Sequence, residues 1–369
     1  MKILFITSSM NAGGAERVAS QLVNTWSSVG YQITLMPTYS GQSECFYQIS
    51  PNVRLIYLRD LLKDHKKSFF KQTIRLNTLR QFIKTDKPDV IISFLSNVNV
   101  MSIIANFGLD IPLIICERTD PFIAPMPSWL KFACFITYPF ATVLMVQTQS
   151  LFDKYIITGW PTKRLHAIAN PIPLEFIDYQ QIKRITSQKR LLSIGRLDAG
   201  KQFDVLIRIF SKLVKRHKNW SLRIIGDGTL RNDLQKQISE LQLDAYIELV
   251  RPSSSIAEEL SQADIFATTS KYEGFPNVLL EAMALGLPCI TFDCPNGPKE
   301  ITLAGQVALL IPLNDEKAYE NALENLILDT ALQERLGLEG CKSVLSRFSL
   351  DKIIKEWDIL FKKMGINTQ

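Results

Sequence analysis

The chain has 369 residues, of which 46% are hydrophobic and 21% are charged. This composition is typical of a globular protein and excludes a low-complexity or disordered chain. The length exceeds what one hydrophobic core normally serves, so we expect two domains. The net charge is +6, and the basic excess lies in the first half, where residues 1–185 carry 19 basic and 12 acidic side chains.

Cysteine, histidine and hydropathy patterns exclude several classes of protein. Six scattered cysteines without a C-x-x-C pair indicate free thiols in a reducing cytoplasm, and three widely separated histidines give no zinc-ligand spacing. The start MKILFITSS has the pattern of a buried strand rather than of a signal peptide. The most apolar long segment, residues 125–146, is interrupted by Lys131 and Pro139, so we expect a helix pair buried in a core and not a membrane span.

Short apolar runs alternate with helical stretches along the whole chain, a pattern that predicts parallel sheets covered by helices. The first series runs from KILFIT to LHAIANPIP, and a second series runs from RLLSIG to PCITFD after a polar stretch. We therefore predict an α/β protein with two doubly wound, Rossmann-like domains facing each other across a cleft. The predicted parts are a first domain of residues 1–170, a linker of 171–189, a second domain of 190–345, and a C-terminal helix of 346–369 packing back toward the first domain.

Ligands of doubly wound sheets bind beyond the carboxyl ends of the strands, and several notable stretches stand at such ends. In NAGGAER, Gly13 and Gly14 would let the backbone approach an anion at the start of the following helix. A tight strand-to-helix turn explains the same two glycines. The third glycine of a dinucleotide-binding turn is absent.

The second domain supplies two further stretches of this kind. In IGRLDAGK, Arg196 and Lys201 follow a strand within one loop, where two cations could neutralise a pyrophosphate. Two exposed basic residues in an ordinary loop are the alternative. In IGDG, Gly226 occupies a turn that can border a nucleotide, and the backbone near Arg251 could hydrogen-bond a base edge. Each of these signals is weak by itself.

The stretch YEGFPNVLLEAMALGLPCI contains a carboxylate, Glu281, among apolar helical residues, and a second carboxylate, Glu273, eight positions before it. Pro276 and Gly286 predict a helix that begins near Asn277 and ends near Leu285. Acidic residues are rarely buried unless paired, so a ligand that completes the hydrogen bonding of Glu281 would explain its place. A diol such as ribose suits Glu281, and a second polyol suits Glu273.

Taken together and in this order, these motifs resemble those of the retaining glycosyltransferases of family 4, which have the GT-B fold. The segments that carry the resemblance are GGAER at 13–17, IGRLDAGK at 194–201, IGDG at 225–228, EGFPNVLLEAMALGLP at 273–288 and NGPKEI at 296–301. The resemblance covers nearly the whole chain, and its most specific element is the pair of glutamates in the fourth segment.

The resemblance implies an acceptor-binding first domain, a nucleotide-sugar-binding second domain and a set of site residues. Glu281 would bind the ribose, Glu273 the transferred sugar, and Arg196 and Lys201 the diphosphate. Relatives carry a histidine after the fourth strand of the first domain, where this chain has Arg118, which would contact donor sugar, phosphate or acceptor. The implied catalytic residues are Glu273, Arg196, Lys201 and Arg118, and the implied donor-binding residues are Gly13, Gly14, Glu281, Gly274, Phe275, Asn277, Gly226 and Arg251.

The implied reaction moves a hexose or N-acetylhexosamine from a nucleoside-diphosphate sugar, in particular a UDP-sugar, to a hydroxyl of a lipid-linked saccharide. The implied acceptor is an undecaprenyl-diphosphate saccharide of bacterial O-antigen or capsule synthesis, met at the cytoplasmic face of the inner membrane. No separate cofactor is expected, and no metal, because the chain contains no D-x-D triplet. A nicotinamide-dependent oxidoreductase and a non-catalytic nucleotide-sugar-binding protein are the alternatives.

A basic segment from Arg59 to Lys87 holds nine basic residues interleaved with apolar ones. Docking on anionic lipid headgroups and a plain solvated helix face explain this pattern equally well. Nucleic acid is not expected as a partner, because no recognition motif accompanies the charge.

Overall fold

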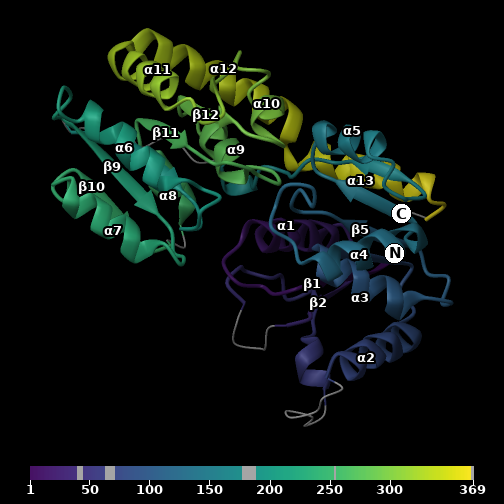
Figure 1. Ribbon diagram of the computed structural model, residues 1–369. Helices are drawn as coiled ribbons and strands as arrows, with labels where there is room; N and C mark the ends of the chain where they lie inside the picture. Colours follow the sequence, from purple (N-terminus) through teal and green to yellow (C-terminus); the bar gives the residue numbers. More distant parts are fainter. Residues whose placement is uncertain (40–44, 63–70, 177–187, 253–254, 367–369) are drawn as a thin grey trace. The chain divides into compact units, whose positions relative to one another are not determined.

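The computed structural model describes residues 1–39, 45–62, 71–176, 188–252 and 255–366, and Figure 1 traces the chain through them. The chain forms two compact units, one of residues 1–170 with 351–369 and one of residues 171–350. Most of the predicted linker, residues 177–187, lies outside the described residues.

The first unit is built on a seven-stranded parallel sheet in the order β3-β2-β1-β4-β5-β6-β7. Its strands are β1 (Lys2–Thr7), β2 (Gln32–Pro37), β3 (Arg54–Leu55), β4 (Val90–Phe94), β5 (Leu113–Cys116), β6 (Val143–Val146) and β7 (Leu165–Ala167). Its helices are α1 (Gly14–Ser28), α2 (Lys71–Asp86), α3 (Ser96–Asn106), α4 (Ser128–Thr137), α5 (Gln149–Ile157) and α13 (Leu350–Lys363), with short 3-10 turns η1 (Leu58–Leu61) and η2 (Tyr138–Phe140).

The second unit is built on a six-stranded parallel sheet in the order β10-β9-β8-β11-β12-β13. Its strands are β8 (Lys189–Ile194), β9 (Trp220–Ile225), β10 (Ile247–Val250), β11 (Ile265–Thr268), β12 (Cys289–Asp293) and β13 (Leu309–Pro312). Its helices are α6 (Phe203–Leu213), α7 (Arg231–Glu240), α8 (Ile256–Ser261), α9 (Asn277–Ala284), α10 (Pro298–Ile301), α11 (Glu316–Leu328) and α12 (Thr330–Phe348), and the 3-10 turn η3 (Leu174–Phe176) precedes them. The predicted class of two doubly wound α/β domains is confirmed.

Both faces of the first sheet are buried, which explains why its strands are continuous apolar runs. Along β1, Ile3 and Phe5 point to one face, which α1 and α13 cover. Leu4 and Ile6 point to the opposite face, which α2, α3 and α5 cover. Because side chains alternate along a strand, a single run of apolar residues serves two cores.

The predicted helix pair at residues 125–146 is wrong. This segment forms one α-helix, α4, then the turn η2 and the buried strand β6. Helix α4 has Cys134 as its buried residue, while Trp129 and Phe132 are 68% and 65% exposed. Apolar composition predicted burial, but α4 lies on the outside of its layer. Within the described residues, no helix is long and apolar enough to cross a bilayer.

The C-terminal helix α13 belongs to the core of the first unit. Its buried residues Ile353, Trp357 and Phe361 recur at the spacing of one helix face. The Trp357 ring meets the Trp26 ring of α1 edge-on, with 5.2 Å between the centroids. The chain therefore completes the core of its first unit only after it has built the second.

Replacing Trp357 by alanine removes a fully buried indole from this core, so we expect the free energy of unfolding of the first unit to fall by about 3–5 kcal/mol. Ile359 on the same helix is 53% exposed, and Ile359→Ala serves as the matched control with a change below about 0.5 kcal/mol. Urea unfolding followed by tryptophan fluorescence measures both. Equal effects of the two substitutions would show that α13 does not stabilise the first unit.

Candidate functional site

The strand order of the second sheet fixes where a ligand can enter. From β8 the chain passes to β9 on one side, whereas β11 lies on the other side of β8. At such a reversal the loops that leave the two strands diverge and open a crevice at their carboxyl ends. Here these are the loops 195–202 and 269–276. They contain three of the four predicted catalytic residues, Arg196, Lys201 and Glu273, together with Gly274 and Phe275 of the predicted donor-binding residues.

The two loops are joined by an ion pair between predicted site residues. The Lys201 ammonium lies 2.5 Å from the Glu273 carboxylate, and the Ser270 hydroxyl donates to the same oxygen at 2.6 Å. The Glu273 side chain is 10% exposed and that of Lys201 is 27% exposed. The backbone amide of Lys271 also donates to the Gly200 carbonyl at 2.8 Å. Both charged side chains are therefore held in place before any ligand arrives.

Glu281 lies on α9, the helix that follows the Glu273 loop. It is 2% exposed, and its neighbours Leu280 and Ala282 are buried as well. Helix α9 packs against α12, where a Cβ atom on Gly337 would come within 2.3 Å of the Gly286 carbonyl oxygen. The glycine thus lets α12 support the end of α9 closely, which fixes the helix that carries Glu281.

The turn before α9 uses the backbone amide of Asn277, one of the predicted donor-binding residues. The Asn277 amide donates to the Phe275 carbonyl at 2.9 Å, and Pro276 has φ −79° and ψ 77°, the geometry of an inverse γ-turn. A phosphate at the Asn277 amide would compete with this hydrogen bond. Gly274 precedes the turn, and the Phe275 ring is buried against Phe348, with 5.9 Å between the centroids.

The remaining predicted cations of this unit face solvent. The Arg196 side chain is 77% exposed and lies 3.1 Å from the Asp198 carboxylate. An exposed pair of this kind has little net stability, so a ligand can replace Asp198 at low cost. Arg251 follows β10 and is also exposed.

Gly226 has a packing role that the sequence did not reveal. A Cβ atom at this position would lie 1.9 Å from the Gly195 carbonyl oxygen, and one at Gly228 would lie 2.4 Å from the Leu197 carbonyl oxygen. The Leu197 amide donates to the Asp227 carbonyl at 2.9 Å. These glycines are therefore required for the loops after β8 and β9 to touch, whatever the site binds.

In the first unit the strand order reverses between β1 and β4, and the predicted glycines lie in the loop after β1. The Gly13 amide donates to the Tyr47 hydroxyl at 3.1 Å, and this hydroxyl donates to the Gly13 carbonyl at 2.9 Å. Gly14 is the first residue of α1. After β4, Leu95 adopts φ +79°, a left-handed conformation that branched and bulky residues rarely adopt and that is often found near functional sites.

Arg118 follows β5 and is 8% exposed. Its guanidinium stacks on the Phe94 ring, 3.4 Å from the centroid, and donates to the Asn170 side-chain oxygen at 2.6 Å. Burial lowers the pKa of Arg118 to about 10, so the group stays charged at neutral pH. Among the described residues its Nε has no hydrogen-bond partner and the side chain forms no salt bridge. A buried cation with neutral neighbours favours an anionic or strongly polar ligand.

Glu117, next to Arg118, belongs to a buried polar network that sequence reasoning missed. Its carboxylate accepts hydrogen bonds from the Tyr138 hydroxyl and, at 2.9 Å, from the Ser96 hydroxyl. Burial raises the pKa of Glu117 from its ordinary value near 4.5 to about 7. Asp120 is paired instead with Lys154 at 2.9 Å. The adjacent residues Glu117 and Arg118 are therefore both buried, and each is held by uncharged partners.

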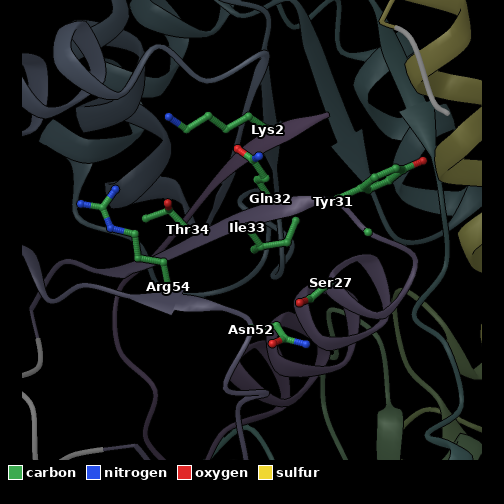
Figure 2. Close-up of a pocket in the computed structure, with 9 residues that line it drawn as sticks. Lys2, Ser27, Tyr31, Gln32, Ile33, Thr34, Asn52 and Arg54 are labelled. Atoms are coloured by element: carbon green, nitrogen blue, oxygen red, sulfur yellow. The ribbon is translucent and has the colours of Figure 1, made fainter.

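A pocket of about 400 Å³ opens elsewhere on the first unit. Figure 2 shows its lining, in which Lys2, Gln32 and Arg54 are the first residues of β1, β2 and β3. It therefore lies at the amino edge of the sheet, opposite to the edge where doubly wound sheets bind ligands. Its cations Lys2 and Arg54 pair with Asp86 at 3.2 Å and 3.1 Å. None of the predicted site residues lines it.

One family model matches most of the second unit. Residues 176–342 match the family model described as glycosyl transferases group 1. This part of the chain is therefore similar to group 1 glycosyl transferase domains. Over the described residues, no three His, Cys, Asp or Glu side chains are grouped so that they could hold a metal ion.

Similar proteins extend over both units. The chain is 29% identical over 363 residues to an α-1,4-N-acetyl-D-galactosaminyltransferase of Campylobacter jejuni, with 97% of each chain covered. It is 29% identical to the amylovoran biosynthesis glycosyltransferase AmsD of Erwinia amylovora, over 97% of this chain and 99% of AmsD. The fold matches a structure of S. aureus TarM in complex with UDP, with a TM-score of 0.82 and 14% identity over 98% of this chain and 100% of TarM.

The Lys201–Glu273 pair predicts strong energetic coupling. Removing either side chain leaves the other charge largely buried and without its ionic partner. The losses in free energy of unfolding caused by Lys201→Ala and by Glu273→Ala should therefore add up to more than the loss in the double variant. We expect a coupling free energy of about 1–3 kcal/mol in urea unfolding. The exposed pair Arg335–Glu339 is the control, with about 0.3–0.5 kcal/mol. A coupling no larger than that of the control would contradict the buried pair.

The raised pKa of Glu117 predicts a pH-dependent stability of the first unit. The folded carboxyl binds its proton more tightly than the unfolded one, so the free energy of unfolding should fall as pH rises from about 4.5 to about 7. Glu117→Gln removes the titrating group and keeps one acceptor oxygen for the hydroxyls, and its free energy of unfolding should gain about 1–3 kcal/mol relative to wild type between those two pH values. Thermal unfolding across this range checks this, with the exposed Glu334→Gln as control. Parallel pH profiles of wild type and Glu117→Gln would refute it.

Proposed function

We propose that the protein is a retaining glycosyltransferase of family 4 that moves a hexose or N-acetylhexosamine from a UDP-sugar to a hydroxyl of a lipid-linked saccharide. The observation that carries this proposal is the Lys201–Glu273 pair at the reversal of strand order, in the loop that leads directly to buried Glu281. A cation for the diphosphate and two carboxylates for polyols are what a nucleotide sugar requires.

The names of similar proteins support the substrate class. The C. jejuni relative is named for its action on a GalNAc-containing saccharide linked to PP-undecaprenol, and AmsD is named for amylovoran biosynthesis. The TarM structure contains UDP. We therefore infer a UDP-linked donor, an undecaprenyl-diphosphate saccharide as acceptor, and a place in bacterial surface polysaccharide synthesis at the inner face of the inner membrane.

In this proposal each site residue of the second unit contacts one part of the donor. Glu281 accepts hydrogen bonds from the ribose hydroxyls and Glu273 from the transferred sugar. Arg196 exchanges its ion pair with Asp198 for one with the diphosphate. Lys201 keeps its ion pair with Glu273 and forms a second one with the diphosphate. Lys201 then links the sugar-binding carboxylate to the leaving group, so the positions of these two parts of the donor depend on one side chain.

The proposed chemistry needs charge stabilisation more than a protein base. As the bond to the sugar breaks, negative charge develops on the departing diphosphate, and fixed cations at that place lower the barrier. With retention, the departing phosphate lies on the face that the acceptor attacks, so its oxygen can take the proton of the acceptor hydroxyl. Arg196 and Lys201 supply the charge in place of a metal ion. Arg118 offers a further cation to a donor or acceptor group at the edge of the first sheet.

A transfer assay tests this proposal. The protein is incubated with UDP-sugars and an undecaprenyl-diphosphate saccharide in excess chelator, and the product linkage is analysed by NMR. We expect transfer that survives the chelator and retains the anomeric configuration. In calorimetry, Glu281→Ala should lose about 1.5–3 kcal/mol of UDP binding free energy, since charge-assisted hydrogen bonds to ribose disappear.

Three outcomes would contradict particular parts of the proposal. UDP binding without hydrolysis or transfer for any sugar would indicate a binding protein instead of an enzyme. Activity lost in chelator and restored by magnesium or manganese would place a metal where we place Arg196 and Lys201. Unchanged UDP affinity of Glu281→Ala would remove the ribose assignment alone.

A further inference from the structure

Helix α4 presents an aromatic face to solvent. Five of its large apolar residues, counting the turn η2 that continues the helix, are about half or more exposed. These are Trp129 (68%), Phe132 (65%), Phe135 (50%), Ile136 (49%) and Phe140 (56%), which we call the aromatic face. Soluble monomers rarely expose so many large apolar side chains together, and where they do, the patch usually binds a partner or a membrane.

Two ring contacts link the aromatic face to neighbouring segments. At its C-terminal end, Phe140 meets Phe107, the residue after α3, edge-on with 5.6 Å between the centroids, and Phe107 is itself 62% exposed. Within the face, Phe135 meets the partly exposed Trp160 in the same way at 5.6 Å. Exposed aromatic side chains of the first unit therefore gather on α4, on η2 and at the end of α3.

Basic side chains accompany this surface. Helix α4 contains Lys131 and no acidic residue. The Arg80 guanidinium donates to the Phe107 carbonyl at 2.7 Å, which places a cation at that end. Lys163 and Arg164 are exposed and follow Trp160 closely in the chain. Asp110, near Phe107 in sequence, is an exposed acidic residue, but the cations are in excess.

We propose that the aromatic face of α4 inserts into the headgroup region of an anionic lipid bilayer. Tryptophan and phenylalanine on one helix face with flanking cations are the pattern of helices that lie in a membrane interface. Ten residues are far too few to span a bilayer, which needs about 20. The helix therefore lies on the membrane and anchors the first unit to it.

A second copy of the chain suits this surface less well. A two-fold interface places the same patch against itself, so its cations would face cations with no acidic residue of α4 to pair with them. An anionic lipid surface attracts all of these cations at once. Charge complementarity therefore selects the lipid.

The proposed membrane contact lies on α4 and not on the basic segment, for which the sequence left lipid docking and a solvated helix face equally open. Residues 63–70 of the basic segment lie outside the described residues, and so does the side chain of Lys71. Within the described part, α2 turns Leu79 and Ile83 into the core and buries Arg75 at 6% exposure against the Tyr39 ring. The apolar anchor is on α4, which the sequence assigned to a core.

Vesicle co-sedimentation of the full chain tests the inference without any turnover, so it can fail independently of the proposed reaction. Vesicles of phosphatidylglycerol and phosphatidylethanolamine are compared with phosphatidylcholine vesicles, at low salt and at about 1 M salt, where the Debye length is about 3 Å. Trp129→Ser, Phe132→Ser and Ile136→Ser are combined in one variant, since these side chains are exposed. The matched control changes Leu241, Leu328 and Leu338, which are exposed on the second unit, to serine.

We expect wild type to prefer anionic vesicles and to keep part of its binding in high salt, because inserted rings are not screened. The triple α4 variant should bind at least about tenfold more weakly, as one lost apolar side chain already corresponds to roughly that factor. It should keep its unfolding profile and its UDP binding. Changing Lys131, Lys163 and Arg164 to serine should reduce binding at low salt only.

Several results would overturn the inference. The inference would fail if wild type and the triple α4 variant bound vesicles equally well. It would also fail if the leucine control lost as much vesicle binding as the α4 variant. A loss of binding confined to a variant with Lys63, Lys66, Lys67 and Lys71 changed to serine would return the contact to the basic segment. Wild type that sediments as a dimer, with a monomeric α4 variant and no vesicle binding by either, would identify a second copy as the occupant.

Discussion

The candidate site depends on one ion pair, the Lys201–Glu273 contact between the loops that leave β8 and β11. These strands are neighbours because the second sheet reverses its order there, although the two residues are far apart in sequence. Partly burying two charges costs solvation, and the pair recovers it by close approach and by the Ser270 hydroxyl. In the proposed reaction, a diphosphate that enters this site would find the Lys201 ammonium already positioned by Glu273.

Close backbone packing at three glycines builds the scaffold around this pair. The loops after β8 and β9 touch only because Gly226 and Gly228 have no side chains, and α12 reaches the end of α9 only because of Gly337. Glu281 is therefore held on a helix that α12 supports closely. The IGDG turn, which the sequence suggested could border a nucleotide, is also needed to build the scaffold, so its glycine pattern alone cannot separate the two roles.

The two units treat charge differently at the carboxyl edges of their sheets. The second unit pairs Lys201 with Glu273 and Arg196 with Asp198, which leaves a nearly neutral site until an anion arrives. The first unit buries Arg118 among an aromatic ring and an amide, and buries Glu117 among hydroxyls. In the second unit, the proposed ligand would take the place of Asp198 beside Arg196. In the first unit, burial of Arg118 and Glu117 costs solvation free energy, which a polar ligand at Arg118 or a proton on Glu117 would reduce.

The sequence by itself determined the fold class, most strands, and the helix that carries Glu281, because period and apolar runs are local properties of the chain. It also brought forward Glu273 and Lys201, since their stretches stand at predicted strand ends, whereas Arg118 came from the resemblance to the family. Only the tertiary structure showed that Lys201 contacts Glu273, that Asn170 and Phe94 hold Arg118, and that Gly226 makes room for a carbonyl oxygen. It also reversed the prediction for α4, because the hydropathy of a segment does not say which of its faces finds a partner. Contacts between loops and the solvent exposure of a side chain depend on how segments distant in sequence pack together. The spacing of residues along the chain does not specify this packing.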